Sequence, residues 1–246
     1  MIVKAFDPAP ERTALMRLAI RVTAGFFLGA MTVTAATAGV PDLTGTWKPA
    51  AGQEEIRTLD GKPPPLLPAA LDVYRRHLQL LKSGDRKLDP VSRCIPPGVP
   101  RIMYENRPFE IVQRPDLVVL LFEYQRLVRH IYVGGSHPPD VAVPPYLGHS
   151  IGHWDGNTLV VDTVDLNDET FLDAAGMPHS DALHIVERLR LLDGGRHLED
   201  VFTVDDPKTF VRSWQARRIY DRKPGMSIRE DACLDREHRA TSLEDE

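Results

Sequence analysis

The chain has 246 residues, and its 35 aspartates and glutamates outnumber its 30 lysines and arginines, which gives a formal net charge of −5 at pH 7. Without a basic excess it has no electrostatic means of gripping nucleic acid or an anionic membrane, so we expect neither as a partner. Its length suffices for one sizeable domain with a core of its own.

The chain begins with the layout of a secretory signal peptide. Arg17 and Arg21 precede an apolar run, residues 22–38, which ends in the small residues Ala-Thr-Ala. A short membrane anchor is the alternative, but the run contains glycines and threonines and is shorter than the roughly 20 apolar residues of a span. Met16 is an alternative start of this leader.

We therefore predict a cleaved signal peptide over residues 1–38 and a single β-rich domain over residues 39–246. The mature protein is expected in the periplasm or outside the cell. No stretch after the leader is long and apolar enough to predict a membrane span.

The first elements of the predicted domain are a short strand at residues 42–49 and an amphipathic helix at residues 68–81. Leucines and Tyr74 recur at helical spacing in the latter, with Pro68 at its start and Gly84 just beyond its end. The loop that follows, residues 89–103, is so rich in proline that we expect neither a helix nor a central strand there.

Only two cysteines are present, Cys94 in that loop and Cys233 near the C-terminus. In an exported protein such a pair most simply forms a disulfide that closes a long loop. A nucleophilic thiol is the alternative, and it is disfavoured because an oxidising compartment consumes free thiols.

The rest of the chain has the alternating pattern of β-strands. Asp-Gly pairs between β-branched runs are typical of hairpin turns. Five or six strands joined hairpin by hairpin, with one amphipathic helix, predict a mainly β fold, an antiparallel sheet that curls into a barrel or sandwich. The strand-bearing segments are residues 109–133, 150–166, 182–206 and 210–220.

Three acidic residues share predicted strand faces with aliphatic residues: Glu123, Asp162 and Glu187. A carboxylate in an apolar interior is costly unless it is paired or protonated, and desolvation raises its pKa toward the range of a general acid or base. Arg129 is the obvious counter-charge and would also stabilise an anion. A buried structural ion pair is the alternative interpretation.

The histidines lie near the ends of the predicted strands, where loops at a barrel mouth usually carry functional groups. We expect His149 and His179 to carry protons there. A metal site would draw on these two with His153 and Asp181, but their spacing matches no metal motif, and we predict no metal.

Ser150 stands in the pattern G-x-S-x-G, residues 148–152, which is the nucleophile elbow of many hydrolases. An elbow needs a buried strand before it and a helix after it, whereas here a proline-rich segment precedes the pattern and a hairpin follows. Serine hydrolysis is therefore a minor alternative.

Several residues near these strands are candidates for contact with a substrate, although aromatic side chains more often pack in an ordinary β core. No glycine-rich phosphate loop joins a strand to a helix, so we predict no nucleotide and no other cofactor. The candidate binding residues are Tyr104, Tyr124, Gln125, Tyr146, Trp154 and Asp181.

Four segments together resemble a large family of exported bacterial proteins to which no reaction is assigned. They are CIPPGVPRIM, FEIVQRPDLVVLLFEYQRLVRHIY, LGHSIGHWDGNTLVVDT and PHSDALHIVERLRLLD, and the resemblance covers roughly residues 42–235. It implies a secreted or periplasmic domain of lipocalin-like, calycin-like type. Asp165 and Leu166 stand where relatives usually have glycine and an aromatic residue.

We therefore expect an antiparallel, lipocalin-like β-barrel that acts on a small organic molecule, aromatic or terpenoid-like. The predicted function is an exported, cofactor-independent acid/base enzyme of the lyase, hydratase or isomerase type. A binding protein that carries an apolar ligand is the first alternative. A hydrolase that uses Ser150 or a histidine-bound metal is the second.

Overall fold

The computed structural model describes residues 39–52, 55–137 and 143–233. All of them belong to one compact unit. The predicted signal peptide, residues 1–38, lies outside the described residues and stays a prediction.

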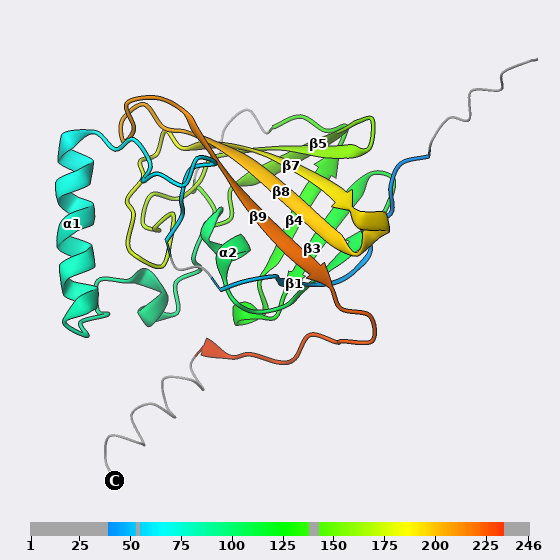
Figure 1. Cartoon of the computed structure of the whole chain (residues 1–246), viewed down its shortest axis with the longest axis horizontal. Coiled ribbons are helices and arrows are strands. Elements are labelled where there is room, and N and C mark those ends of the chain that lie inside the picture. The colour runs from blue at the N-terminus through cyan, green and yellow to red at the C-terminus, as the bar shows by residue number, and fades with distance from the viewer. Residues whose placement is uncertain (1–38, 53–54, 138–142, 234–246) are drawn as a thin grey trace, which may run out of the picture. The chain divides into compact units, whose positions relative to one another are not determined.

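Nine strands in the described part of the chain close into a barrel, with each strand beside its neighbour in sequence and β1 pairing with β9 (Figure 1). The predicted mainly β barrel is thus confirmed, with more strands than the five or six expected. The strands are β1 (Gly45–Pro49), β2 (Phe109–Gln113), β3 (Leu117–Phe122), β4 (Val128–Val133), β5 (His149–Asp155), β6 (Thr158–Val164), β7 (His184–Leu192), β8 (His197–Asp205) and β9 (Trp214–Arg222).

The turns explain most of this order. Gly156 and Gly194 have φ angles of 60° and 65°, and they provide the tight turns between β5 and β6 and between β7 and β8 that the Asp-Gly pairs predict. The exception is the longer connection between β4 and β5, which lets these two strands pair in parallel. The barrel therefore contains one parallel pair in an otherwise antiparallel sheet.

An irregular turn near Gln125 separates β3 from β4. Gln125 and Arg126 both have positive φ angles, 52° and 53°, within a short 3-10 helix at Tyr124–Arg126. This turn shifts the inward-facing positions by one residue. Even-numbered residues such as Val118 and Leu120 are therefore buried in β3, whereas odd-numbered residues such as Arg129 are buried in β4. Val119 and Leu121 of β3 are only partly buried.

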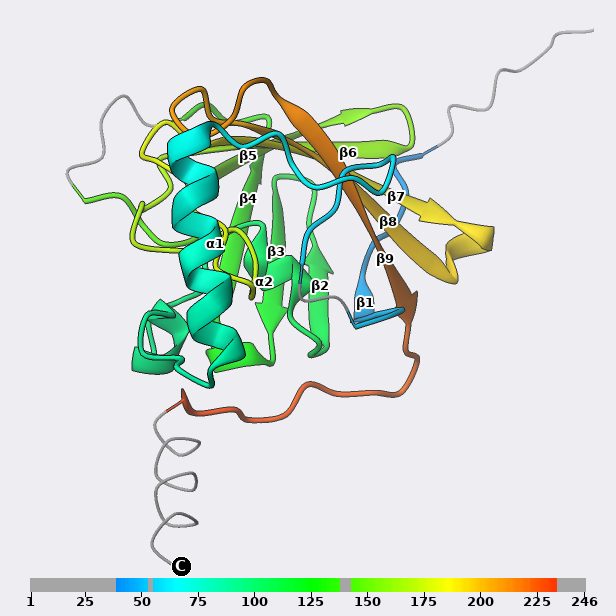
Figure 2. The same ribbon diagram turned by 60° about the vertical axis from the view of Figure 1, so that its left-hand side comes forward.

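The predicted helix is confirmed as α1 (Pro68–Lys82), which stands beside one end of the barrel (Figures 1 and 2). It is fixed to the loop between β6 and β7: the Tyr74 hydroxyl donates to Asp173 at 3.2 Å, and His77 Nδ1 donates to the Gly176 carbonyl at 2.7 Å. The amphipathic pattern alone could not show which loop receives this helix.

A second helix, α2 (Arg101–Tyr104), corrects the expectation that residues 89–103 contain none. The prolines all precede the helix, and Pro100 is its N-cap, where a missing N–H removes no helical hydrogen bond. All of its residues are buried, and the Met103 carbonyl accepts a hydrogen bond from the Tyr220 hydroxyl at 2.9 Å. The helix thus fills part of the barrel interior.

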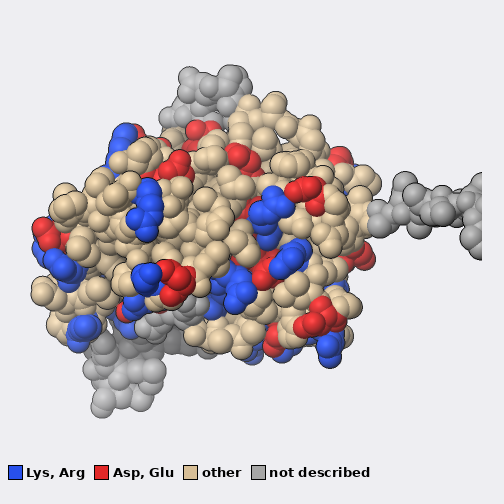
Figure 3. All heavy atoms as spheres, turned by 45° about the horizontal axis from the view of Figure 1, so that its top comes forward, with Lys and Arg blue, Asp and Glu red and all other residues tan. Residues whose placement is uncertain are grey.

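The C-terminal segment runs back along the barrel and is covalently fixed. Cys94 and Cys233 form the predicted disulfide, with their Cα atoms 5.6 Å apart. Within the described residues no helix has the length and apolar character of a membrane span. On the face shown in Figure 3, acidic and basic side chains are interspersed.

Candidate functional site

Four neighbouring strands converge on a buried ion pair inside the barrel. Arg129 of β4 donates through Nη1 to Glu187 Oε1 of β7 at 2.9 Å, and its Nη2 contacts Oε2 of the same carboxylate. Between them lie Ser150 of β5, whose Oγ is 3.1 Å from both Nε and Nη2, and Thr163 of β6, whose Oγ1 is 2.9 Å from Nη2. All four side chains are almost completely buried.

The surroundings of Arg129 favour its charged form. Burial opposes the charge of Arg129, but the attraction and hydrogen bonds of Glu187, together with the attraction of Asp200, raise the pKa of the guanidinium. Strand alternation correctly placed Glu187 and Arg129 on the interior face. Their catalytic role stays a prediction, since a structural ion pair has the same geometry.

A second group of polar side chains lies inside the barrel, of which only Tyr104 was among the residues singled out from the sequence. Asp200 of β8 is 0 % exposed, and neither of its oxygens has a hydrogen-bond partner among the described atoms. Burial, followed by the negative charge of Glu187, raises its pKa well above the usual carboxyl range, against the attraction of Arg129. The buried Tyr104 hydroxyl also has no hydrogen-bond partner among the described residues, and the guanidinium of Arg218 in β9 lies 4.9 Å from the centre of the Tyr104 ring.

The same alternation that revealed Glu187 could have revealed these residues. Asp200 alternates with Leu198 and Phe202, and Arg218 alternates with Ala216 and Tyr220, all of them buried. A charged residue between buried apolar neighbours on one strand face is the signal in both cases. Thr163 is recognised only through its contact with Arg129, and the contact of Ser150 with Arg129 could not be inferred from its G-x-S-x-G pattern.

A pocket of about 300 Å³ opens on the side of the barrel between β4 and β5, next to the strands that carry Arg129 and Ser150. It exists because the parallel pairing starts only at Ile131 and Ser150, so the first residues of the two strands are not joined. Arg129 and Ser150 are among its lining residues, together with His149 and Tyr146. We call it the β4–β5 pocket.

His149 is the titratable group best placed for chemistry in this pocket. Its Nδ1 atom is buried and has no hydrogen-bond partner among the described atoms. Gly148, with φ of 67°, precedes it where an added Cβ would lie 2.8 Å from the Val164 carbonyl oxygen. The backbone can pass this close to β6 only with glycine, and this fixes the position of His149.

Alternation predicted that Asp162 points into the barrel, and this prediction was wrong. Leu159, Val161 and Thr163 are completely buried on the inner face of that strand, whereas Asp162 lies on the outer face and is only partly buried. Its two oxygens accept hydrogen bonds from two imidazoles there, at 2.8 and 3.0 Å. Burial opposes the charge of this carboxylate, but these bonds outweigh burial and lower its pKa.

The donors to Asp162 are His137 Nε2, from the loop after β4, and His184 Nε2, from β7. His184 therefore lies on the outer face of the barrel, beside Asp162. In the described parts of the chain no group of three or more His, Cys, Asp or Glu side chains is arranged to hold a metal ion.

Glu123 and His179 are buried or half-buried but are engaged in holding loops. Glu123 Oε2 accepts the backbone N–H of Arg229 at 3.0 Å, which fixes the C-terminal segment. His179 Nδ1 donates to the Ser180 carbonyl at 3.0 Å, and its Nε2 accepts from the Thr170 hydroxyl at 2.7 Å. Burial lowers the pKa of His179, which favours this neutral form. Neither residue lines the β4–β5 pocket.

The predicted binding residues are similarly dispersed. Tyr146 lines the β4–β5 pocket and Tyr104 lies inside the barrel, but Asp181 is exposed and forms an ion pair with Lys208 at 2.6 Å. Tyr124 is buried, and the backbone N–H of Gln125 donates to Asp231 in the C-terminal segment. Trp154 packs against the core. The binding roles of Tyr146 and Tyr104 therefore stay predictions. The positions of the other four residues do not support a binding role.

Ser150 lies within strand β5 rather than on a sharp turn between a strand and a helix. Its hydroxyl contacts Arg129 and Thr163, at 3.1 and 3.0 Å, and no imidazole is among its hydrogen-bond partners in the described structure. A nucleophilic serine needs an adjacent base, so its surroundings do not favour the hydrolase alternative.

No known protein-family model and no curated protein matches the chain. The resemblance to exported bacterial proteins thus stays a prediction, and the function is argued from the site alone.

Proposed function

We propose that the protein is an exported, cofactor-independent acid/base enzyme that converts a small organic molecule in the β4–β5 pocket. The observation that supports this most directly is the pairing of a fixed cation with a titratable group in one pocket. Arg129, kept charged by Glu187, lines the pocket together with His149, whose Nδ1 has no partner among the described atoms.

The division of roles follows from the chemistry of the two groups. A neutral imidazole nitrogen can remove a proton from carbon or oxygen and later return it, and histidine is suited to this near neutral pH. The guanidinium, held rigid by Glu187 and Ser150, would stabilise the negative charge that forms on the substrate when the proton leaves. Substrates with a carboxylate or carbonyl next to an acidic C–H bond fit this arrangement.

The pocket size limits the substrate. A volume of about 300 Å³ lies at the lower end of the usual range for small-molecule sites. Apolar side chains such as Leu127 and Leu147 also line it, and Tyr146 adds an aromatic surface. We therefore propose a compact organic acid or carbonyl compound with an apolar part as the substrate.

A binding protein without turnover is the second candidate, and the hydrogen bonds of Arg129 favour it. The guanidinium is already bonded to Glu187, Ser150 and Thr163, as in a purely structural network. A ligand held in the centre of the barrel is disfavoured, because large side chains such as Trp47, Phe202 and Tyr220 fill that space with 0 % exposure. Such a protein would also bind its ligand in the β4–β5 pocket.

An extracytoplasmic location belongs to this proposal. It is supported by the disulfide between Cys94 and Cys233, because such bonds persist mainly in oxidising compartments.

The experiment uses hydrogen exchange, which needs no knowledge of the net reaction. The purified protein is incubated in D₂O with phenylacetate, 3-hydroxybutyrate, cyclohexanone and levulinate, and proton NMR follows the loss of C–H signals. We expect catalysed exchange for at least one compound. His149→Gln should slow it by about 100-fold or more, the usual contribution of a general base.

The matched control is His153→Gln, since His153 is exposed on the same strand and does not line the pocket. It should leave exchange unchanged. Binding without exchange, detected by saturation-transfer NMR, would favour the binding protein. Equal exchange by the wild type and His149→Gln would exclude the proposed role of His149.

A further inference from the structure

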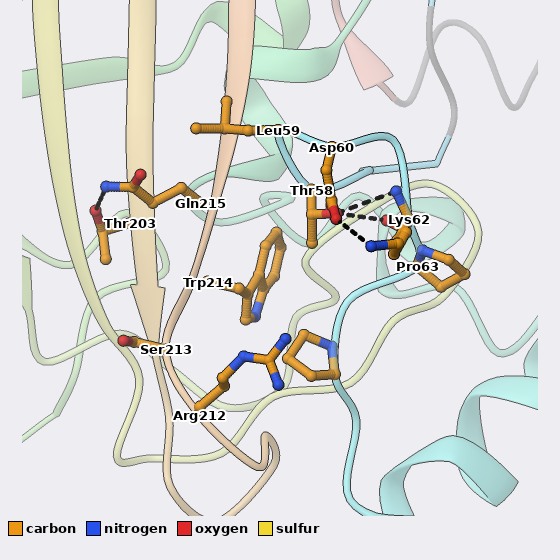
Figure 4. Close-up of a pocket in the computed structure, with 11 residues that line it drawn as sticks. Thr58, Leu59, Asp60, Lys62, Pro63, Thr203, Arg212, Ser213, Trp214 and Gln215 are labelled. Atoms are coloured by element: carbon orange, nitrogen blue, oxygen red, sulfur yellow. Dashed lines mark hydrogen bonds and ion pairs between the residues drawn. The ribbon is translucent and has the colours of Figure 1, made fainter.

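A second pocket, of about 470 Å³, lies between the segment 58–65 and the beginning of β9 (Figure 4). It shares no lining residue with the β4–β5 pocket. We call it the Trp214 pocket. Trp214, Arg212, Leu59 and Pro63 are the lining residues on which the following inference depends.

The walls of the Trp214 pocket are held by backbone hydrogen bonds. The Leu59 N–H donates to the Gln215 carbonyl at 3.0 Å, and the Val211 N–H donates to the Pro65 carbonyl at 2.9 Å. The segment 58–65 is thus joined to the barrel at both of its ends. A pocket built in this way is preformed, so ligand binding loses little conformational entropy in ordering its walls.

The indole of Trp214 provides a hydrogen-bond donor without an acceptor. The side chain is 5 % exposed, and its Nε1 atom is buried with no partner among the described atoms. In Figure 4 the nitrogen-bearing edge of this indole faces the space in which the guanidinium of Arg212 lies. A buried indole N–H usually has a partner, which makes a ligand acceptor the natural complement.

Positive charge prevails among the lining residues. Arg212 is exposed and forms no ion pair within the described part of the chain. Lys62 is 2.6 Å from Asp60, the pocket's one carboxylate, and its hydrogen bond, with that of Thr58, lowers the pKa of Asp60 to about 2. The charges of Lys62 and Asp60 offset each other, so Arg212 leaves the pocket with a net positive charge.

We propose that the Trp214 pocket binds a small organic carboxylate with an apolar body. The carboxylate accepts hydrogen bonds from the indole N–H of Trp214 and from the guanidinium of Arg212, which supplies the matching charge. The apolar body contacts Leu59 and Pro63 and the face of the indole ring. The inference is independent of the proposed acid/base chemistry.

The test uses cyclohexanecarboxylate as the probe and the uncharged cyclohexanecarboxamide as its matched analogue. The chain contains three tryptophans, so ¹⁵N-labelled protein gives three indole N–H signals, and Trp214→Phe identifies the relevant one by its loss. We expect this signal alone to move saturably as the carboxylate is added. The carboxamide should bind about tenfold more weakly, as befits the loss of a charge-assisted hydrogen bond.

Two arginine variants test the charge. Arg212→Gln should weaken carboxylate binding about tenfold, whereas Arg114→Gln, an exposed arginine in the turn between β2 and β3, should not. His149→Gln should leave the affinity unchanged, which separates this site from the proposed enzymatic one. Calorimetry gives the affinity of Trp214→Phe, which keeps an aromatic ring but lacks the N–H donor and should bind the carboxylate severalfold more weakly.

Three results would each overturn the proposal. The first is equal affinity for the carboxylate and the carboxamide, and the second is an affinity unaffected by Arg212→Gln. The third is the absence of a saturable shift of the Trp214 signal, including the case in which only Trp47 or Trp154 responds.

Discussion

Replacing Asp200 with asparagine should stabilise the folded protein at neutral pH. The side chain lies wholly inside the barrel, and its oxygens have no hydrogen-bond partner among the described atoms. Burial, and then the charge of Glu187, raises the pKa of Asp200 well above the usual carboxyl range, even though Arg129 attracts its ionised form. Asparagine has nearly the same shape and carries no proton to lose.

The sign of the pH dependence follows from the protons bound in each state. Below about pH 4 both the folded and the unfolded chain hold the proton of Asp200, so this group makes no difference. Above that pH the unfolded chain has lost the proton while the folded protein retains it. The free energy of unfolding therefore falls by about 1.4 kcal/mol per pH unit until the raised pKa of the folded state is reached.

Urea unfolding, followed by tryptophan fluorescence with the disulfide intact, measures this effect in steps between about pH 4 and about pH 8. The difference between Asp200→Asn and the wild type removes the contributions of all other carboxyl groups. The difference in the free energy of unfolding should be small at acidic pH. As the pH rises, the variant should become increasingly more stable than the wild type. Asp205→Asn, at an exposed position at the end of the same strand, is the control and should give a flat, small difference.

A destabilisation of about 2 kcal/mol or more at neutral pH would refute this reasoning, because it is the size expected when a paired, buried carboxylate is lost. Asp200 would then be an ionised partner of the interior arginines. A difference independent of pH would equally show that its proton is not retained in the fold.

Three further changes test other parts of the structure by the same unfolding assay. Glu187→Gln leaves the buried charge of Arg129 without its partner and should cost about 3–5 kcal/mol, so a loss below about 1 kcal/mol would contradict a buried pair. Asp162→Asn should cost less than about 1 kcal/mol at neutral pH, because this carboxylate is partly exposed. Its lowered pKa makes that contribution vanish as the pH falls through the folded pKa, and a pH-independent cost would argue against the two imidazole contacts. Replacing both Cys94 and Cys233 with serine should cost about 2–5 kcal/mol, since the bridge joins residues 139 positions apart, and an unchanged stability would refute this role.

Local patterns were sufficient to predict much of the architecture. The helix at 68–82 is set by the spacing of its apolar residues and by Pro68, and the hairpins around Gly156 and Gly194 are set by their Asp-Gly turns. The interior position of Glu187 follows from alternation within one regular strand. In each case the information lies within a few consecutive residues.

The positions of Asp162 and Glu123 show where such patterns fail. In β6 the apolar residues occur on both faces, so alternation could not distinguish inward from outward, and Asp162 was assigned to the wrong side. Gln125 and Arg126 have positive φ angles and shift the inward-facing positions by one residue between β3 and β4. Glu123 therefore lies at a turn, where its carboxylate contacts the C-terminal segment. Neither effect is visible without knowing the neighbouring strands.

By itself the sequence determined a β-rich barrel with one long helix and a disulfide. It also indicated that Arg129 and Glu187 lie on inward faces of their strands. Only the tertiary structure decided that Arg129 meets Glu187, that Asp200 has no hydrogen-bond partner among the described residues, and that the pockets open where they do. The physical reason is that residues in contact across a closed barrel are far apart in the chain. Their meeting depends on strand register and closure, which no single segment encodes.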